Sequence, residues 1–139
     1  MRYGRSEEEW ARLADAGKNF LVERAVMQRT TSYTELNAAL VNRTATAGFN
    51  FDLDADRAAI GELLGQISDD SLTETGGLLI SALVQYLDTN DAGPGFYTLA
   101  RNRGLAVPNN ADGRQVFWAT HVGALHKRYA PTRPRRSTR

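Results

Sequence analysis

The chain has 139 residues and a formal net charge of +1, and its 42% hydrophobic and 24% charged residues are typical of one globular domain with a single core. It contains no cysteine, which excludes a disulfide framework, a thiolate nucleophile and a cysteine-based zinc site. Its longest apolar run, residues 78–84, is too short to span a bilayer, and a glutamate-rich helix near the start does not fit a signal peptide, so we expect a cytoplasmic protein without membrane contact.

Two capping boxes predict helices in the first third of the chain. Ser6 with Glu9 opens a helix that reaches about residue 27, and Ser32 with Glu35 opens a shorter one. The apolar stripe of the first helix is formed by Trp10, Leu13, Gly17 and Leu21. The stripe of the second helix is formed by Tyr33, Leu36, Leu40 and Val41. Residues 42–50 are then expected to form a loop.

The middle of the chain predicts one more helix and then one strand. Asp54 is expected to cap this helix. Its core face has apolar residues at i, i+3, i+4 and i+7, namely Ile60, Leu63, Leu64 and Ile67. Residues 78–87 are rich in apolar side chains over the length of a buried strand, with a short partner expected near Thr30 or Gly76. Residues 88–95 are expected to turn.

The last third predicts a short helix, a long helix and a tail. Residues 96–100 favour a short helix that ends at Gly104, and Asp112 is expected to cap the last helix. The apolar stripe of that helix is formed by Trp118, Val122, Leu125 and Tyr129. A separate stripe, expected at or near the surface, is formed by Arg114, His121 and Arg128. Residues 131–139 have four arginines and no large apolar residue, so we expect a disordered basic tail after a single globular domain of residues 1–130.

These elements predict a mainly α fold with a small β element, in the α+β class. Three helices followed by a strand are the order of a winged-helix-like core, to which the last helix and the basic tail are added. A helical bundle with a separate hairpin is the alternative architecture.

Charge is distributed unevenly along the chain. Residues 1–43 have seven cations and six carboxylates (+1), residues 44–100 have one cation and nine carboxylates (−8), and residues 101–139 have nine cations and one carboxylate (+8). A basic segment attracts phosphates or an acidic partner, and an acidic segment repels phosphates. Fifteen of the seventeen cations are arginine, which favours a bacterium with a GC-rich genome, or one of its phages, as the source.

No motif of the chain indicates catalysis, a metal or a cofactor. Asp52, Asp54 and Asp56 alternate as in a calcium loop, but Arg57 then occupies the glycine position and Leu63 the position of the bidentate glutamate. Two histidines five residues apart on one helix lie about 140° apart around its axis, so they do not form a zinc-binding pair. Because the catalytic and phosphate-binding glycine motifs are also absent, we expect neither an enzyme nor a bound cofactor.

Three short segments have a family resemblance. Residues 30–36 read T-T-S-Y-T-E-L, residues 57–61 read R-A-A-I-G, and residues 79–84 read L-I-S-A-L-V. They resemble the T-T-Y, R-A-V-G and P-C-H-R-V segments in the winged-helix DNA-binding domain of alkylguanine alkyltransferases and alkyltransferase-like proteins. The resemblance implies that Tyr33 acts at a target phosphate and that Arg57 takes the place of a flipped base. Ser81 stands where that family has its reactive cysteine, so the resemblance bears on architecture more than on activity.

Two functions remain open from the sequence. The first is a non-enzymatic regulatory protein that binds nucleic acid without sequence preference, through phosphate contacts from its C-terminal helix and tail. The residues expected to make these contacts are Arg114, Lys127, Arg128, Arg133, Arg135 and Arg136, with Tyr33 and Arg57 added by the resemblance. The second is a protein-binding inhibitor or adaptor whose acidic face imitates nucleic acid. The residues expected on that face are Asp52, Asp54, Asp56, Glu62, Asp69 and Asp70.

Overall fold

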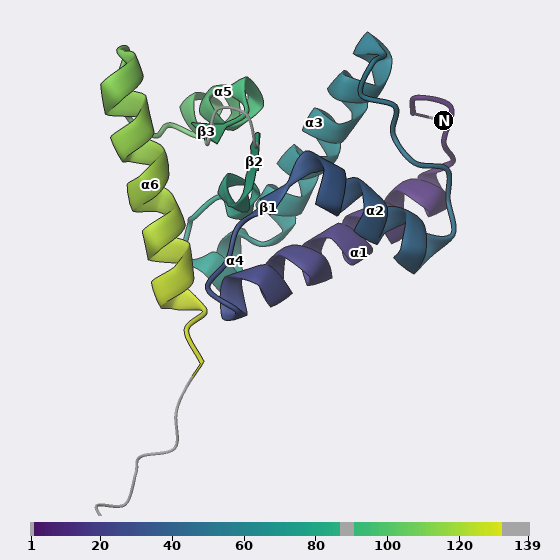
Figure 1. The fold of residues 1–139 in the computed structure, drawn as a ribbon, viewed down its shortest axis with the longest axis horizontal. Coiled ribbons are helices and arrows are strands. Elements are labelled where there is room, and N and C mark those ends of the chain that lie inside the picture. Colours follow the sequence, from purple (N-terminus) through teal and green to yellow (C-terminus); the bar gives the residue numbers. More distant parts are fainter. Residues whose placement is uncertain (1, 87–90, 132–139) are drawn as a thin grey trace, which may run out of the picture.

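A computed structural model describes residues 2–86 and 91–131 of the chain (Figure 1). Helices dominate, and one short three-stranded sheet joins the two halves of the molecule. The elements in chain order are α1 (Glu7–Val26), β1 (Thr31–Ser32), α2 (Tyr33–Thr44), α3 (Asp54–Asp70), α4 (Leu72–Thr75), the 3-10 helix η1 (Ile80–Leu83), β2 (Val84–Tyr86), β3 (Asp91–Ala92), α5 (Pro94–Asn102) and α6 (Ala111–Arg128). The predicted fold class, mainly α with a small β element, is confirmed. The winged-helix arrangement stays a prediction, and residues 132–139 of the predicted tail lie outside the described residues.

Helix α1 packs against both α2 and α3, and the predicted apolar stripes of these helices lie largely in that core. In the α2 stripe, Leu36 and Leu40 are buried, whereas Tyr33 and Val41 are partly exposed. All four members of the α3 stripe are buried, as are those of the α1 stripe. Gly17 lies where α1 meets α3, and a Cβ at this position would come within 2.6 Å of Ile67 Cδ1. Glycine therefore allows the two helices to approach closely, which buries both stripes in one core.

The sheet connects distant segments of the chain. Its strand order is β1-β2-β3, with β1 parallel to β2 and β2 antiparallel to β3. Thr31 is in register with Val84, and Gln85 with Ala92. The partner strand predicted near Thr30 is thereby confirmed.

The long strand predicted over residues 78–87 is wrong. Residues Ile80–Leu83 form one 3-10 turn, and of the residues described in this range, 78–86, only Val84–Tyr86 pair as a strand. The backbone N–H of Ser81 donates to Ser68 Oγ at 3.1 Å rather than to a neighbouring strand. At Ser81, a hydrogen bond to a core side chain therefore takes the place of a hydrogen bond to a neighbouring strand.

Two helix starts also differ from the prediction. Ser6 and Ser32 cap α1 and α2 as expected, with Ser32 and Glu35 forming a full capping box. However, the N-cap of α3 is Leu53 and that of α6 is Asn110, so the predicted caps Asp54 and Asp112 are wrong. Both aspartates lie in the first turns of their helices, where a negative charge still interacts favourably with the helix dipole.

The last helix, α6, stands along one side of the molecule, from α5 at one end to the end of α1 at the other (Figure 1). Trp118 and Leu125 attach it to the core, and Trp118 Nε1 donates to the Ala82 carbonyl oxygen at 2.8 Å. None of the helices in the described ranges has both the length and the hydropathy of a membrane-spanning segment.

Candidate nucleic-acid interface

Ion pairing divides the cations of the described residues into two groups. The cations that pair with a carboxylate are Arg2, Arg5, Lys18, Arg24, Arg43, Arg57 and Arg103. The cations without a carboxylate partner within the described ranges are Arg12, Arg29, Arg101, Arg114, Lys127 and Arg128. The unpaired group thus includes every described cation of the +8 segment except Arg103.

One cluster of unpaired cations lies where α6 ends. Gln28 Nε2 donates to the His126 carbonyl oxygen at 2.7 Å, and a ring nitrogen of His126 lies 3.1 Å from the Arg29 carbonyl oxygen. These contacts hold the Arg29 backbone against His126, which directly precedes Lys127 and Arg128 in α6. The sequence analysis missed Arg29, because its place beside α6 depends on contacts between residues almost a hundred positions apart.

The Arg128 side chain is positioned by backbone at the same end. Its Nε donates to the Glu74 carbonyl oxygen at 2.9 Å, which holds the guanidinium near the α4 end of the molecule. Lys127 is exposed and makes no ion pair with the described residues. The predicted tail cations Arg133, Arg135 and Arg136 lie outside the described residues.

A second cluster lies toward the other end of α6, where Arg114 is about 21 Å from Arg128 along the helix axis. Here Arg114 of α6 and Arg101 of α5 both line a hollow of about 360 Å³. The Arg114 guanidinium lies 6.0 Å from the Tyr97 ring centroid and donates to the Asn109 carbonyl oxygen at 2.6 Å. The sequence analysis missed Arg101, although Tyr97 and Arg101 are four residues apart on α5 and so share a face.

Two of the residues that the resemblance singles out, Tyr33 and Ser81, lie close together in the structure. Both line a small cavity of about 30 Å³, together with Gly61 and Gly65 of α3. Ser81 Oγ is buried without a hydrogen-bond partner among the described residues, and burial raises the pKa of the Tyr33 hydroxyl. Arg57 is not among the residues that line this cavity.

Arg57 is instead engaged at the start of α3. Its guanidinium contacts the Asp54 carboxylate and the Phe51 carbonyl oxygen. The structure therefore brings together two of the three residues that the resemblance singles out.

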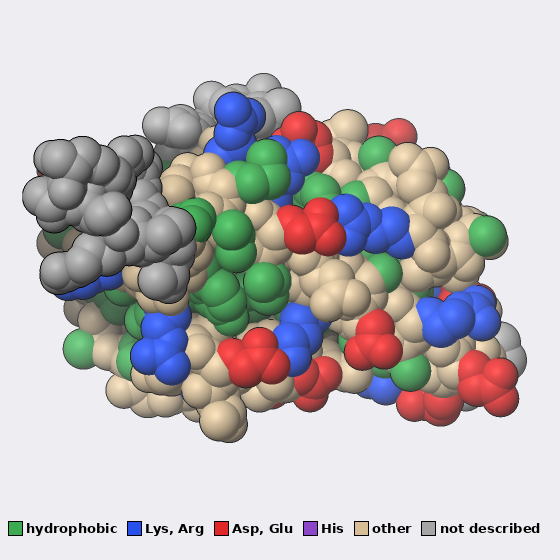
Figure 2. Space-filling view, turned by 90° about the horizontal axis from the view of Figure 1, so that it is seen from below, with side chains coloured by type: hydrophobic (Ala, Val, Ile, Leu, Met, Phe, Trp, Pro, Cys, Tyr) green, Lys and Arg blue, Asp and Glu red, His purple; other side chains and the backbone are tan. Residues whose placement is uncertain are grey.

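The residues assigned to the acidic face are spread along α3. Asp54 and Asp56 lie at its start, Glu62 in its middle, and Asp69 and Asp70 at its end, about 24 Å from Asp54, while Asp52 precedes the helix. Among those assigned to the acidic face, Asp54, Glu62 and Asp69 form ion pairs. Asp52, Asp56 and Asp70 form none with the described residues. On the face seen from below in Figure 2, acidic and basic side chains likewise lie next to each other.

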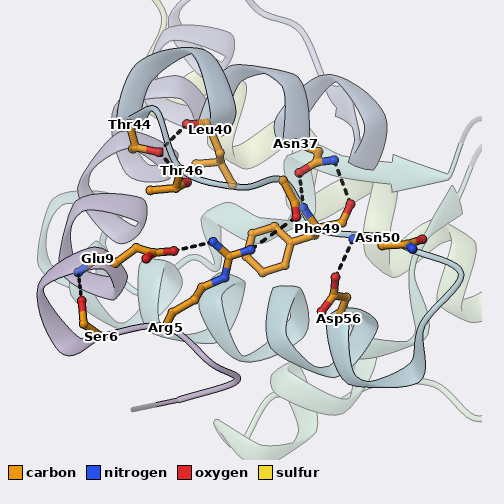
Figure 3. A network of polar contacts seen from close by, with 11 residues as sticks. Arg5, Ser6, Glu9, Asn37, Leu40, Thr44, Thr46, Phe49, Asn50 and Asp56 are labelled. Atoms are coloured by element: carbon orange, nitrogen blue, oxygen red, sulfur yellow. Dashed lines mark hydrogen bonds and ion pairs between the residues drawn. The ribbon is translucent and has the colours of Figure 1, made fainter.

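Polar contacts hold the loop of residues 45–53 that leads to the acidic start of α3 (Figure 3). Asn37 bonds both backbone groups of Phe49, accepting from its N–H at 2.8 Å and donating to its carbonyl oxygen at 3.0 Å. The buried Arg5 guanidinium lies 4.3 Å from the Phe49 ring centroid and pairs with Glu9 at 2.6 Å. Asp56 accepts from the Asn50 N–H at 2.6 Å, so this carboxylate is already hydrogen-bonded.

His121 does not belong to a surface stripe. It is 7% exposed, and its Nε2 accepts the Leu79 N–H at 2.8 Å. Burial lowers its pKa to about 4, so the ring is neutral at physiological pH. No group of three or more potential metal ligands occurs among the residues that the structure describes.

No protein-family model, no curated protein and no solved structure matches this chain. Its function is therefore inferred from the two clusters of unpaired cations and their surroundings.

Proposed function

We propose that this protein binds nucleic acid without catalysing a reaction, by neutralising backbone phosphates with the cations of its C-terminal helix and tail. The observation that supports this proposal best is the lack of carboxylate partners for Arg114, Lys127 and Arg128 within the described residues. A cation that is already paired must give up its carboxylate before it contacts a phosphate, whereas an unpaired cation only releases water and counterions.

The proposed binding does not depend on base sequence. No recognised motif places side chains to read base edges, so phosphate neutralisation is the mechanism that the charges support. Arg133, Arg135 and Arg136 add three more cations beyond the end of α6. Tyr33 and Arg57 enter the proposal only through the family resemblance, and Arg57 would first have to leave Asp54.

A salt titration against one labelled duplex tests the proposal. If four to six phosphates are contacted, log K declines with log salt with a slope of about −4 to −5, and deletion of residues 131–139 makes the slope shallower. Lys127→Gln is expected to reduce the slope by about 0.9, the contribution of one phosphate. Arg103→Gln is the matched control, because Arg103 Nε already donates to Asp69 Oδ1 at 2.7 Å. A tail deletion that binds as tightly as the full chain, or no binding at low salt, would refute the proposal.

The acidic segment predicts the opposite response. Replacing Asp52, Asp54 and Asp56 with Asn removes three negative charges that repel phosphate, so duplex affinity is expected to rise at low salt. The gain is expected to disappear as salt screens the repulsion. Unchanged affinity at low salt would show that the bound duplex lies far from the start of α3.

The alternative function is a protein-binding inhibitor or adaptor that presents the acidic residues to a basic partner. The observation in its favour is that Asp52, Asp56 and Asp70 form no ion pair with the described residues. These three carboxylates are spread from just before α3 to its end, and the other three acidic-face residues form ion pairs. Any one face therefore has less unpaired negative charge than the sequence suggests. Failure of the duplex titration would favour this alternative.

A further inference from the structure

We propose that the hollow between α5 and α6 binds one phosphodiester group, with Arg101 and Arg114 both contacting the same phosphate. This inference rests on the proposed nucleic-acid function and assigns one of its contacts to a defined place. It involves no covalent step.

One face of α5 and the start of α6 form the walls of the hollow. Arg101 comes from α5, Arg114 from α6, and Asp91 from β3. The complete lining is Asp91, Ala92, Pro94, Tyr97, Thr98, Arg101 and Arg114. A hollow of about 360 Å³ has room for a phosphate together with an attached sugar. Two arginines therefore line one space that is large enough to hold an anion.

Arg114 is held in position before any ligand binds. Its Nη1 donates to the Asn109 carbonyl oxygen at 2.6 Å, and its guanidinium rests over the Tyr97 ring. The contact with Asn109 uses one end of the guanidinium, so Nη2 and Nε keep their donors for a phosphate. A preordered arginine loses less side-chain entropy when it binds.

Helix stability does not explain this placement. Arg114 is the fourth residue of α6, at the end of the helix where the dipole disfavours a cation. The same dipole favours an anion near the start of α6, beside the hollow that Arg101 also lines. A cation kept at a helix start thus adds to the positive potential of the hollow.

Asp91 is the carboxylate that lines the hollow, and it holds two neighbouring groups in place by hydrogen bonds. Its Oδ1 accepts from the Tyr97 hydroxyl and from the Ala92 N–H, both at 2.7 Å. It forms no ion pair with either arginine. Two cations and one carboxylate leave a net charge of +1, which matches the single negative charge of a phosphodiester. Asp91 is therefore a positioning residue for Tyr97, on which Arg114 rests.

A double-mutant cycle with the full chain and a labelled duplex tests the assignment. Arg101→Gln and Arg114→Gln are each expected to weaken binding several-fold. Because both residues contact one phosphate, the double variant is expected to weaken binding by less than the product of the two single effects. Its salt slope is expected to be shallower than that of the wild type by about 0.9, the contribution of that one phosphate. Arg101→Gln combined with Lys127→Gln is the control, for which the effects multiply and the slope falls by about 1.8.

The outcomes separate this inference from the proposed function. If the duplex binds and the tail deletion weakens it, but the Arg101 and Arg114 effects are absent or multiply, the assignment is overturned and the proposed function stands. If the duplex does not bind, the proposed function fails, and inorganic phosphate is titrated while the side-chain Nε–H signals of both arginines are followed by NMR. Saturating shifts of both signals would support the hollow as a site for free phosphate, and unchanged signals would overturn it. Arg114→Lys, which keeps the charge but removes the planar fork, provides a second variant with the same fold.

Discussion

The stability of this protein is expected to depend on pH through His121. The ring is buried against Phe96 and Phe117, with centroids 5.4 and 5.8 Å away, and its Nε2 accepts the Leu79 N–H. Its surroundings in the adjoining cavity, which include Leu78 and Val116, are likewise uncharged. A protonated ring would lose the acceptor nitrogen and place a charge among these apolar groups.

The sign and size of the effect follow from the pKa of His121, which burial lowers from 6.5 to about 4 in the folded state. The unfolded chain therefore binds a proton near pH 6.5 that the folded chain does not bind until about pH 4. The contribution of His121 is fully present above pH 6.5 and is lost as the pH falls toward 4. Between pH 7 and pH 5 the free energy of unfolding is expected to fall by about 2 kcal/mol from this group alone.

Urea unfolding at several pH values between 5 and 8 measures this loss. His121→Gln is the matched control, because the amide oxygen of Gln can accept the Leu79 N–H but does not titrate. The variant is expected to be less stable than the wild type at pH 7 and to change less between pH 7 and pH 5. If the wild type and the variant lose the same free energy over this interval, His121 is not a buried neutral acceptor and the reasoning fails.

Three further substitutions test the packing and polar contacts. Ile60→Ala, at a side chain that is 3% exposed, is expected to lower the free energy of unfolding by about 2–5 kcal/mol in urea titrations, and an unchanged midpoint would show that this face of α3 is not in the core. Asn37→Ala removes both bonds to Phe49 and is expected to cost about 1–3 kcal/mol, with faster amide exchange at Phe49 as a local readout. Trp118→Phe leaves the buried Ala82 carbonyl oxygen without its donor, at a cost of about 1–3 kcal/mol, and a thermal midpoint equal to that of the wild type would contradict the contact.

The helices with regular apolar spacing could be predicted from the residue pattern, and so could two of their starts, at Ser6 and Ser32. The stripe on α3 and the capping box of Ser32 with Glu35 involve residues within one or two turns of each other, so their side chains meet whatever the rest of the chain does. The basic character of α6 and the tail could also be predicted, because the charge of a side chain follows from its residue type alone.

Which residues form strands, which cations lack a carboxylate partner and which side chains share a space all depend on packing between elements. Residues 80–83 turn as a 3-10 helix because Ser68 Oγ takes the Ser81 N–H, a contact between separate elements. His121 shares a helix stripe with Arg114 and Arg128, yet it is buried, and its Nε2 accepts the Leu79 N–H. Arg101 and Arg114 line one hollow because α5 and α6 meet, with Phe96 packed against Phe117 and His121. Local spacing specifies which face a residue occupies on its own helix, whereas its partner depends on how the helices pack, and no periodicity within a single helix encodes that packing.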